Sequence, residues 1–427
     1  MFVKIIISYI LRLKLFEYFL ILFFANKIKT TYNKNHNINI LILDLERFGE
    51  NIDNLIDIKY FNFYYLPTKW QDNLTFISEM NFNKFLKIQN KFNIISSDEG
   101  KKFLKKILLK ILIKKNIDCV LTCGAYYRRN INWEKILKNS KIPIFCLHKE
   151  SVGLSREINF LVNKSHYQNL RKFYGNLLFV ANHHMKDLLV SINYFPKDQI
   201  HVVGLPKIDN LFNLKNTKNT TKKTNDAILL FSFYHTYLMD EMTLTHGHWS
   251  NDGSFGFCKL FDSVHGTIAK FAKNNPSIEV TIKIKWKDEI WEKKIIESIE
   301  KYKLNFHEID NLKIDWKTDA QKLINLNDTI VSFNSTTLTE ALYLGKKTII
   351  PIYEEAKNKY AKNVLWSNNE SFIRVFSESE FYSNLGNFNE FKFRYNDNVN
   401  NTLEEAFGYI DGMNSMRLSK HIRNFLA

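Results

Sequence analysis

The chain has 427 residues, a length that suits two domains. Its 45% hydrophobic and 24% charged residues exclude a wholly disordered chain and a multi-span membrane protein, and its 14 Gly and 6 Pro exclude collagen-like and proline-rich classes. The net charge of +16 favours an anionic partner. Because the lysines are dispersed, we expect phosphate-bearing substrates or anionic lipid headgroups rather than nucleic acid.

The N-terminal segment, residues 5–24, is apolar and long enough to cross a bilayer. Arg12, Lys14 and Glu17 interrupt its centre, where charges are costly. Three interpretations stay open: a helix in the membrane interface, a single-span anchor, or a first helix packed on the domain. We expect residues 1–30 to form a hydrophobic, basic, membrane-proximal helix of a cytoplasmic protein, with peripheral attachment to the inner face of the plasma membrane as an option.

Residues 36–213 alternate short apolar strands with helices, which is typical of a parallel sheet covered by helices on both faces. Residues 100–115 carry apolar side chains at helical spacing and predict a basic helix. The expected strands are residues 38–44, 118–123, 144–148, 177–181 and 200–203.

Residues 214–226 (LKNTKNTTKKTND) are polar and are typical of an interdomain linker. The alternation restarts in residues 227–400, and residues 401–427 are expected to be helical, with the option of crossing back to the first half. The expected strands of the second half are residues 227–233, 278–284, 329–333 and 348–352. The sequence therefore predicts an α/β protein with two Rossmann-like domains whose parallel sheets face each other across a cleft.

The most informative segment is residues 333–351 (FNSTTLTEALYLGKKTIIP), where a strand runs into Ser335, Thr336 and Thr337 and then into an amphipathic helix. Hydroxyls and free backbone N–H groups at a helix start can bind a phosphate, and Glu340 lies one turn in, within reach of a ribose diol. The alternative needs no ligand, because Thr337 and Glu340 also have the spacing of a capping box.

The segment HVVGLPKIDNLF, residues 201–212, follows a strand with Gly204, Pro206 and Asp209. Glycine permits a turn that a side chain would obstruct, and proline stiffens it. We expect this segment to have a positional role, with Asp209 as a helix N-cap.

Two further segments of the second half carry candidate side chains. In VTIKIKWKD, residues 280–288, Lys283 and Lys285 are two apart, so a strand would place both on one face, and we expect Lys285 to contact phosphates. His235 begins a glycine-containing loop that continues through residues 245–261. Although His246, His248 and Asp252 lie in this loop, no further ligands have recognisable spacing, and we expect no metal.

In the first half, the strand at residues 144–148 leads into His148 and Glu150. A transferase needs a carboxylate or histidine to take a proton from a hydroxyl, so Glu150 is the candidate base and His148 the second choice. Arg128 and Arg129 are candidates for binding an acidic acceptor, because arginine suits phosphate and carboxylate. An ion pair or a helix cap is the alternative for the His148–Glu150 segment.

Two of these segments resemble GT-B glycosyltransferases of surface and capsular polysaccharide biosynthesis, which are related to UDP-GlcNAc 2-epimerase-like and CDP-glycerol glycerophosphotransferase-like proteins. Residues 201–212 resemble the end of the N-terminal domain of these proteins. The second segment matches their donor-nucleotide motif at Ser335, Thr336, Thr337, Glu340, Ala341, Gly345, Lys346 and Pro351.

The resemblance implies a GT-B-like fold in which residues 36–213 bind the acceptor and residues 227–400 bind the donor nucleotide. Ser335, Thr336, Thr337, Glu340, Lys285 and His235 would then contact the donor. The implied activity is transfer of a sugar from a nucleotide-activated donor to a glycan or lipid-linked acceptor of capsule or lipopolysaccharide (EC 2.4), with no cofactor or bound metal.

Three alternatives stay open. A CDP-polyol phosphotransferase of the teichoic-acid type and a sugar-nucleotide 2-epimerase share the fold. A non-catalytic, membrane-associated protein that binds nucleotide sugars belongs to a different class.

Overall fold

The structure is a computed structural model, and it separates into two compact units. It describes residues 14–32, 37–55, 58–80, 98–149, 168, 170–216, 226–236, 255–361, 364–386 and 393–427. The first unit comprises Met1–Ser151, Asn163–Asn210 and Asp411–Ala427, and the second comprises Val152–Val162 and Leu211–Ile410. Both units are α/β with parallel sheets, which confirms the predicted fold class.

Sheet A of the first unit has the order β1-β3-β2-β4-β5-β6-β7. Its strands are β1 (Lys29–Tyr32), β2 (Ile38–Ile42), β3 (Phe61–Tyr65), β4 (Cys119–Thr122), β5 (Ile144–His148), β6 (Leu177–Val180) and β7 (Ile200–Val202). Only the edge strand β1 is antiparallel to its neighbour. The central strands are short and buried on both faces, so they read as continuous apolar runs. The sequence pattern predicts neither β1 nor β3, and β1 begins at Lys29, inside the range of residues 1–30 that is expected to be helical.

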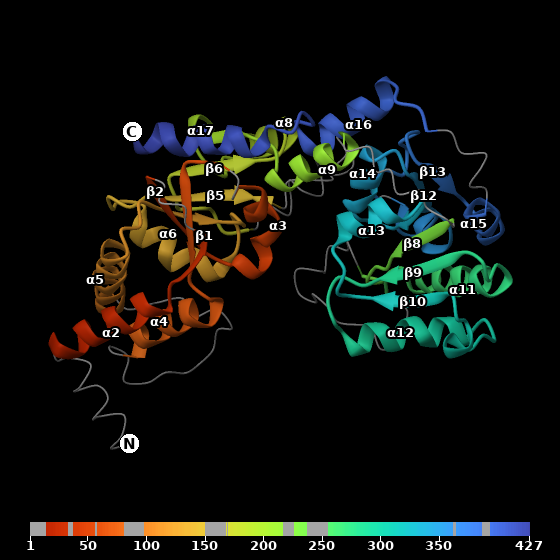
Figure 1. Cartoon of the computed structure of the whole chain (residues 1–427), viewed down its shortest axis with the longest axis horizontal. Helices are drawn as coiled ribbons and strands as arrows, with labels where there is room; N and C mark the ends of the chain where they lie inside the picture. The colour runs from red at the N-terminus through yellow and green to blue at the C-terminus, as the bar shows by residue number, and fades with distance from the viewer. Residues whose placement is uncertain are drawn as a thin grey trace, which may run out of the picture. The chain divides into compact units, whose positions relative to one another are not determined.

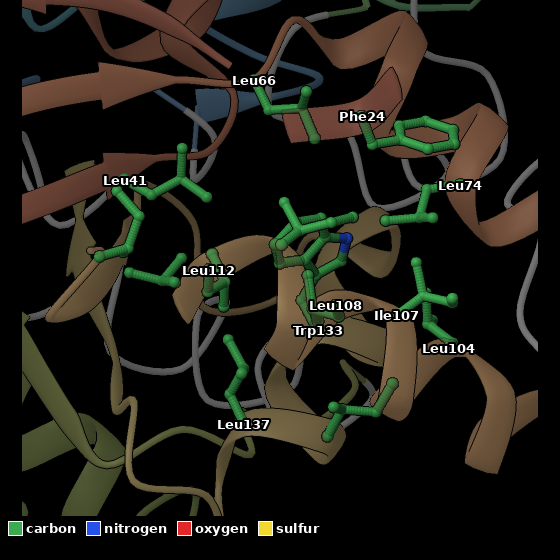
Figure 2. Packing of buried hydrophobic residues seen from close by; sticks show 14 of the residues in the cluster. Phe24, Leu41, Leu66, Leu74, Leu104, Ile107, Leu108, Leu112, Trp133 and Leu137 are labelled. Carbon is green, nitrogen blue, oxygen red and sulfur yellow. The ribbon is translucent and has the colours of Figure 1, made fainter. Parts of the chain in front are cut away.

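Helices cover both faces of sheet A (Figure 1). They are α2 (Lys14–Lys27), α3 (Leu45–Leu55), α4 (Thr68–Met80), α5 (Asp98–Lys114), α6 (Ile131–Leu137), α8 (His183–Ser191), α17 (Asn414–Leu426) and the first part of α9 (Pro206–Asn216). The predicted helix at residues 100–115 is α5, and Leu104, Leu108 and Leu112 on its inner face pack around Trp133 (Figure 2).

Helix α2, the described part of the N-terminal segment, packs on the domain, as the third interpretation expects, whereas residues 1–13 lie outside the described residues. Leu20, Ile21, Phe24 and Ala25 are buried in the cluster that α5 and Trp133 share (Figure 2). Among the residues that the structure describes, no helix has the length and apolarity to cross a membrane.

The segment with Gly204, Pro206 and Asp209 receives the C-terminal helix. Backbone N–H groups of Asn414 and Ser415, in the first turn of α17, donate to the Asp209 carboxylate at 3.0 and 2.8 Å. Asp209 therefore caps α17 rather than its own helix, α9, which begins at Pro206. Burial raises the pKa of Asp209, and the N–H bonds oppose that rise.

Sheet B of the second unit has the order β10-β9-β8-β11-β12-β13, and all its strand pairs are parallel. The strands are β8 (Ala227–Phe231), β9 (Glu279–Lys283), β10 (Leu312–Asp315), β11 (Thr329–Ser332), β12 (Lys347–Pro351) and β13 (Ile373–Val375). The helices are α11 (Cys258–Asn274), α12 (Glu289–Glu300), α13 (Ala320–Leu326), α14 (Thr337–Tyr343), α15 (Glu378–Leu385) and α16 (Asp397–Phe407). Numbered within the unit, the strand order is 3-2-1-4-5-6, the doubly wound order of nucleotide-binding domains.

We predict that Gly204→Ala destabilises the first unit by about 1–3 kcal/mol. Gly204 has φ +78°, and a Cβ there would overlap the side chain of Asn414. The midpoint of urea denaturation measures the loss. Gly49→Ala is the matched control, because a Cβ on Gly49 in α3 meets nothing within 4 Å and alanine favours a helix. Equal midpoints for the two variants would contradict the close approach of α17.

Candidate functional site

The carboxyl edge of sheet B brings together the candidate residues of the second unit. Strands β8 and β11 are neighbours at the point where the strand order reverses, and Phe231 lies opposite Ser332 in their register. Open α/β sheets bind ligands outside the carboxyl ends of their strands at such a point. His235 follows β8 and Ser335 follows β11, so both lie at this edge.

The turn between β11 and α14 is built on Asn334, which has φ +51° and is buried. Its Oδ1 accepts a hydrogen bond from the Leu365 N–H at 2.8 Å. The Ser335 Oγ lies 2.8 Å from the Thr337 Oγ1 and accepts from the Thr337 N–H at 3.3 Å. Ser335, Thr336 and Thr337 are half-buried, so hydroxyl groups line a turn that the protein interior holds in place.

The capping-box alternative for this turn is wrong. Helix α14 begins at Thr337, which makes Thr336 the N-cap residue, and Thr336 makes no side-chain cap hydrogen bond. Glu340 is only 2% exposed, and the Gln321 Nε2 donates to its carboxylate at 3.3 Å. Glu340 thus lies against Gln321 in the interior, and its contact with a ribose stays a prediction.

Lys283 and Lys285 do not share a strand face, so that prediction is wrong. Strand β9 ends at Lys283, whose buried Nζ lies 3.8 Å from an Asp315 carboxylate oxygen. Burial lowers the pKa of Lys283, and Asp315 opposes this. Lys285 lies beyond the strand and is exposed, with its Nζ 5.6 Å from the centre of the Trp286 ring. Lys283 is thus paired with Asp315 inside the protein, whereas the side chain of Lys285 is exposed to solvent, and its contact with a phosphate stays a prediction.

Next to Lys285 lies a group of aromatic side chains that the sequence pattern does not predict. The Tyr234 ring centre lies 4.1 Å from that of Trp291 and 6.0 Å from that of Trp286, which is 46% exposed. The Tyr234 hydroxyl donates to Asp288 at 2.6 Å, and Asp288 also caps α12. Burial raises the pKa of Asp288, but hydrogen bonds from Tyr234, Trp291 and Ile290 together hold it below its usual value. The sequence does contain a signal for this group, because Asp288, which precedes a helix, lies between Trp286 and Trp291.

His235 is buried at the start of the loop after β8. Its carbonyl accepts from the Phe257 N–H at 2.6 Å, and the preceding residue, Gly256, has φ +88°. A Cβ on Gly256 would overlap the His235 carbonyl, so glycine lets the two segments meet. Burial, aided by Lys294, lowers the pKa of His235 to about 4 and keeps the ring neutral. Its role toward a donor stays a prediction.

In the first unit, His148 ends β5 and is fully buried, with its ring centre 5.5 Å from that of Tyr126. Glu150 lies outside the described residues. The chemistry proposed for both therefore stays a prediction.

Arg129 lies at the carboxyl edge of sheet A, where its guanidinium is 3.4 Å from Asp44 and 3.3 Å from Asp72. Asp44 has φ +57°, and the Asn130 Nδ2 donates to its carboxylate at 2.7 Å. An acidic acceptor would compete with two carboxylates for Arg129, and that binding stays a prediction. Arg128 begins the short helix Arg128–Asn130, and its side chain lies outside the description.

Within the described ranges, the His, Cys, Asp and Glu side chains form no group of three or more that could hold a metal ion. His246, His248 and Asp252 lie outside those ranges.

Comparison with known proteins defines the fold. No protein-family model matches the chain, and no curated protein does. The UDP-GlcNAc 2-epimerase of Methanocaldococcus jannaschii is 13% identical to this chain. The structural match covers 90% of this chain and 99% of that enzyme, with a TM-score of 0.50. A putative UDP-N-acetylglucosamine 2-epimerase of Listeria monocytogenes is 10% identical, and the match covers 91% of this chain and 96% of that enzyme. Its TM-score is also 0.50. The wall teichoic acid polymerase TagF matches 73% of each chain at 12% identity and a TM-score of 0.48.

The chain therefore has a GT-B-like fold, as the sequence resemblance implies.

We predict that the protein loses stability as the pH falls from about 6.5 to 4, because burial lowers the pKa of four histidines in the described part of the folded chain, His421 among them. Burial lowers the pKa of His201, His235 and His265 from 6.5 to about 4. Between about pH 6.5 and 4 the unfolded chain therefore binds more protons than the folded chain, so the free energy of unfolding is highest above this pH range and falls within it. Urea denaturation across the window should show this fall, and His201→Phe should reduce it. His307→Gln, at an exposed position, controls for the loss of one imidazole. Equal slopes for all three proteins would contradict the assignment to His201.

Proposed function

We propose that this chain is an enzyme that acts on a nucleotide-activated sugar, and that it transfers the sugar to a bacterial surface glycan such as capsule or lipopolysaccharide. One observation supports the proposal: His235 and the Ser335–Thr337 turn follow β8 and β11, the neighbouring strands at the reversal point of sheet B, and exposed Lys285 follows β9, the next strand along. The fold supports it, because the solved epimerases that share it are named for UDP-GlcNAc.

In this proposal the donor diphosphate lies over the Ser335–Thr337 turn, with Lys285 supplying positive charge. Hydroxyls and a lysine stabilise the charge that develops on a leaving diphosphate, which lowers the barrier of a direct displacement. Trp286, exposed beside Lys285, offers an apolar face at the same edge. Glu150 takes the proton of the acceptor hydroxyl, with His148 as the second candidate base and Arg128 and Arg129 as acceptor ligands.

A sugar-nucleotide 2-epimerase is the second candidate. It is favoured by the extent of the structural match, since the Methanocaldococcus jannaschii enzyme covers 90% of this chain and 99% of its own length. An epimerase needs no acceptor glycan, so the two activities separate by their substrates.

We predict that one nucleoside diphosphate raises the melting temperature, since a ligand that binds only the folded state stabilises it by about 2.7 kcal/mol at a hundredfold excess over Kd. Melting curves with UDP, CDP and GDP measure this. Lys285→Ala should weaken binding, whereas Lys322→Ala, which removes an exposed lysine from α13, should not. No stabilisation by any nucleotide would contradict the proposal. A response to CDP alone would favour the polyol phosphotransferase.

We predict that Glu150→Gln lowers the turnover of the stabilising nucleotide's sugar conjugate by about 10²–10⁴-fold, the usual contribution of a general base. Melting with nucleotide should be unchanged, which controls for folding. Nucleotide release that requires an added glycan indicates transfer, and conversion of the sugar without a glycan indicates epimerisation. If the unchanged chain binds the nucleotide but does not turn over its sugar conjugate, the result would support the non-catalytic alternative instead.

A further inference from the structure

Helix α2 presents aromatic side chains away from the core of the first unit. Tyr18 is 62% exposed and Phe19 is 58% exposed, while the opposite face of the helix is buried. The Phe19 ring stacks on Phe16 and Phe23, with centres 6.3 and 6.1 Å apart. Phe23 in turn meets the edge of Trp70 on α4, at 5.3 Å. Tyr18 and Phe19 are thus exposed, and Phe19 is continuous with half-buried rings that pack against the core of the unit.

Helix α5, which packs against α2 (Figure 1), carries exposed lysines. Its inner face is apolar and buried, and Ile113, near its end, is 66% exposed. The exposed lysines are Lys101, Lys102, Lys105, Lys106, Lys110 and Lys114. The acidic residues of α5 are confined to its first turn, at Asp98 and Glu99. The outward face beyond that turn is therefore basic along its length.

The aromatic and basic side chains lie on two helices that are in contact. Glu17 of α2 pairs with Lys106 of α5 at 2.5 Å, so the basic side chains of α5 begin next to α2. Lys27 lies 4.9 Å from the ring centres of both Phe23 and Trp70. Aromatic rings with lysine amines at their margins have the composition of helices that lie in a membrane interface.

We propose that α2 and α5 dock the first unit on an anionic lipid bilayer. The lysines of α5 contact lipid phosphates, and Tyr18 and Phe19 enter the boundary between headgroups and acyl chains. A nucleic acid would satisfy the lysines but offers no apolar layer to receive Tyr18, Phe19 and Ile113. Attachment is peripheral, because Leu20 and Phe24 of α2 are held in the protein core. This inference does not depend on the reaction catalysed.

Sedimentation of the full chain with vesicles tests the charged half of the surface. We expect binding to phosphatidylcholine vesicles with about 30% phosphatidylglycerol, and weaker binding without the anionic lipid. Replacing Lys102, Lys105 and Lys110 by Gln should weaken binding about 100-fold, since each lysine near an anionic surface contributes a factor of about five. The control replaces Lys273, Lys322 and Lys357, all exposed in the second unit, and should bind as the unchanged chain does. Equal loss in both triple variants would overturn the proposal.

The aromatic half is tested by Phe19→Ser, which should weaken vesicle binding about tenfold while the melting temperature stays close to that of the unchanged chain. Phe376→Ser, at another exposed phenylalanine, is the matched control. Equal binding by Phe19→Ser and the unchanged chain would overturn insertion of α2. Loss of binding on deletion of residues 2–13, with no effect of the α2 and α5 substitutions, would also overturn the proposal. Binding to duplex DNA but not to vesicles would assign the lysines to nucleic acid.

Discussion

One constraint sets the arrangement of the second unit: all strands of sheet B run in the same direction, so every strand ends at the same edge. Loops that are far apart in sequence therefore follow strands that end at the same edge. His235, Lys285 and Ser335 come from loops after three different strands. The helices that return the chain cover both faces and leave this edge for polar groups. In open α/β sheets this edge is where ligands bind, so the topology alone makes it the candidate site.

The sequence predicts much of this fold, because buried parallel strands are continuous apolar runs bounded by polar turns. Residues 329–333 and 348–352 are predicted as strands for that reason, and they correspond to β11 and β12. Strands β1, β3, β10 and β13 are not predicted, because each is short and contains polar residues in place of a continuous apolar run. Within the candidate site, the Ser335–Thr337 turn follows from local pattern, whereas the strand pattern misplaces Lys285, which lies beyond the end of β9. The surroundings of the turn do not follow from local pattern, because partners such as Gln321 for Glu340 are set by the packing of separate helices.

Burial separates the candidate residues into two kinds. Lys285 and Trp286 are exposed and can meet a ligand directly, whereas His235 and Glu340 are enclosed by the protein. Enclosed polar groups hold a turn in one geometry only when they are hydrogen-bonded. In the same way, Asn334 fixes the β11–α14 turn by its bond to Leu365. Sequence patterns identify the residue types of both kinds but do not distinguish a ligand contact from its support.

The bond between Asp209 and the start of α17 has a consequence for the order of folding. The first unit is discontinuous, and the helix that Asp209 caps follows the whole second unit along the chain. During synthesis the ribosome delivers that helix only after about 200 intervening residues, at roughly 5–20 residues per second. For those seconds the surface that Leu418 and Ile422 later cover is open to solvent. The nascent first unit therefore passes through an interval in which chaperones and neighbouring chains can reach its unfinished core.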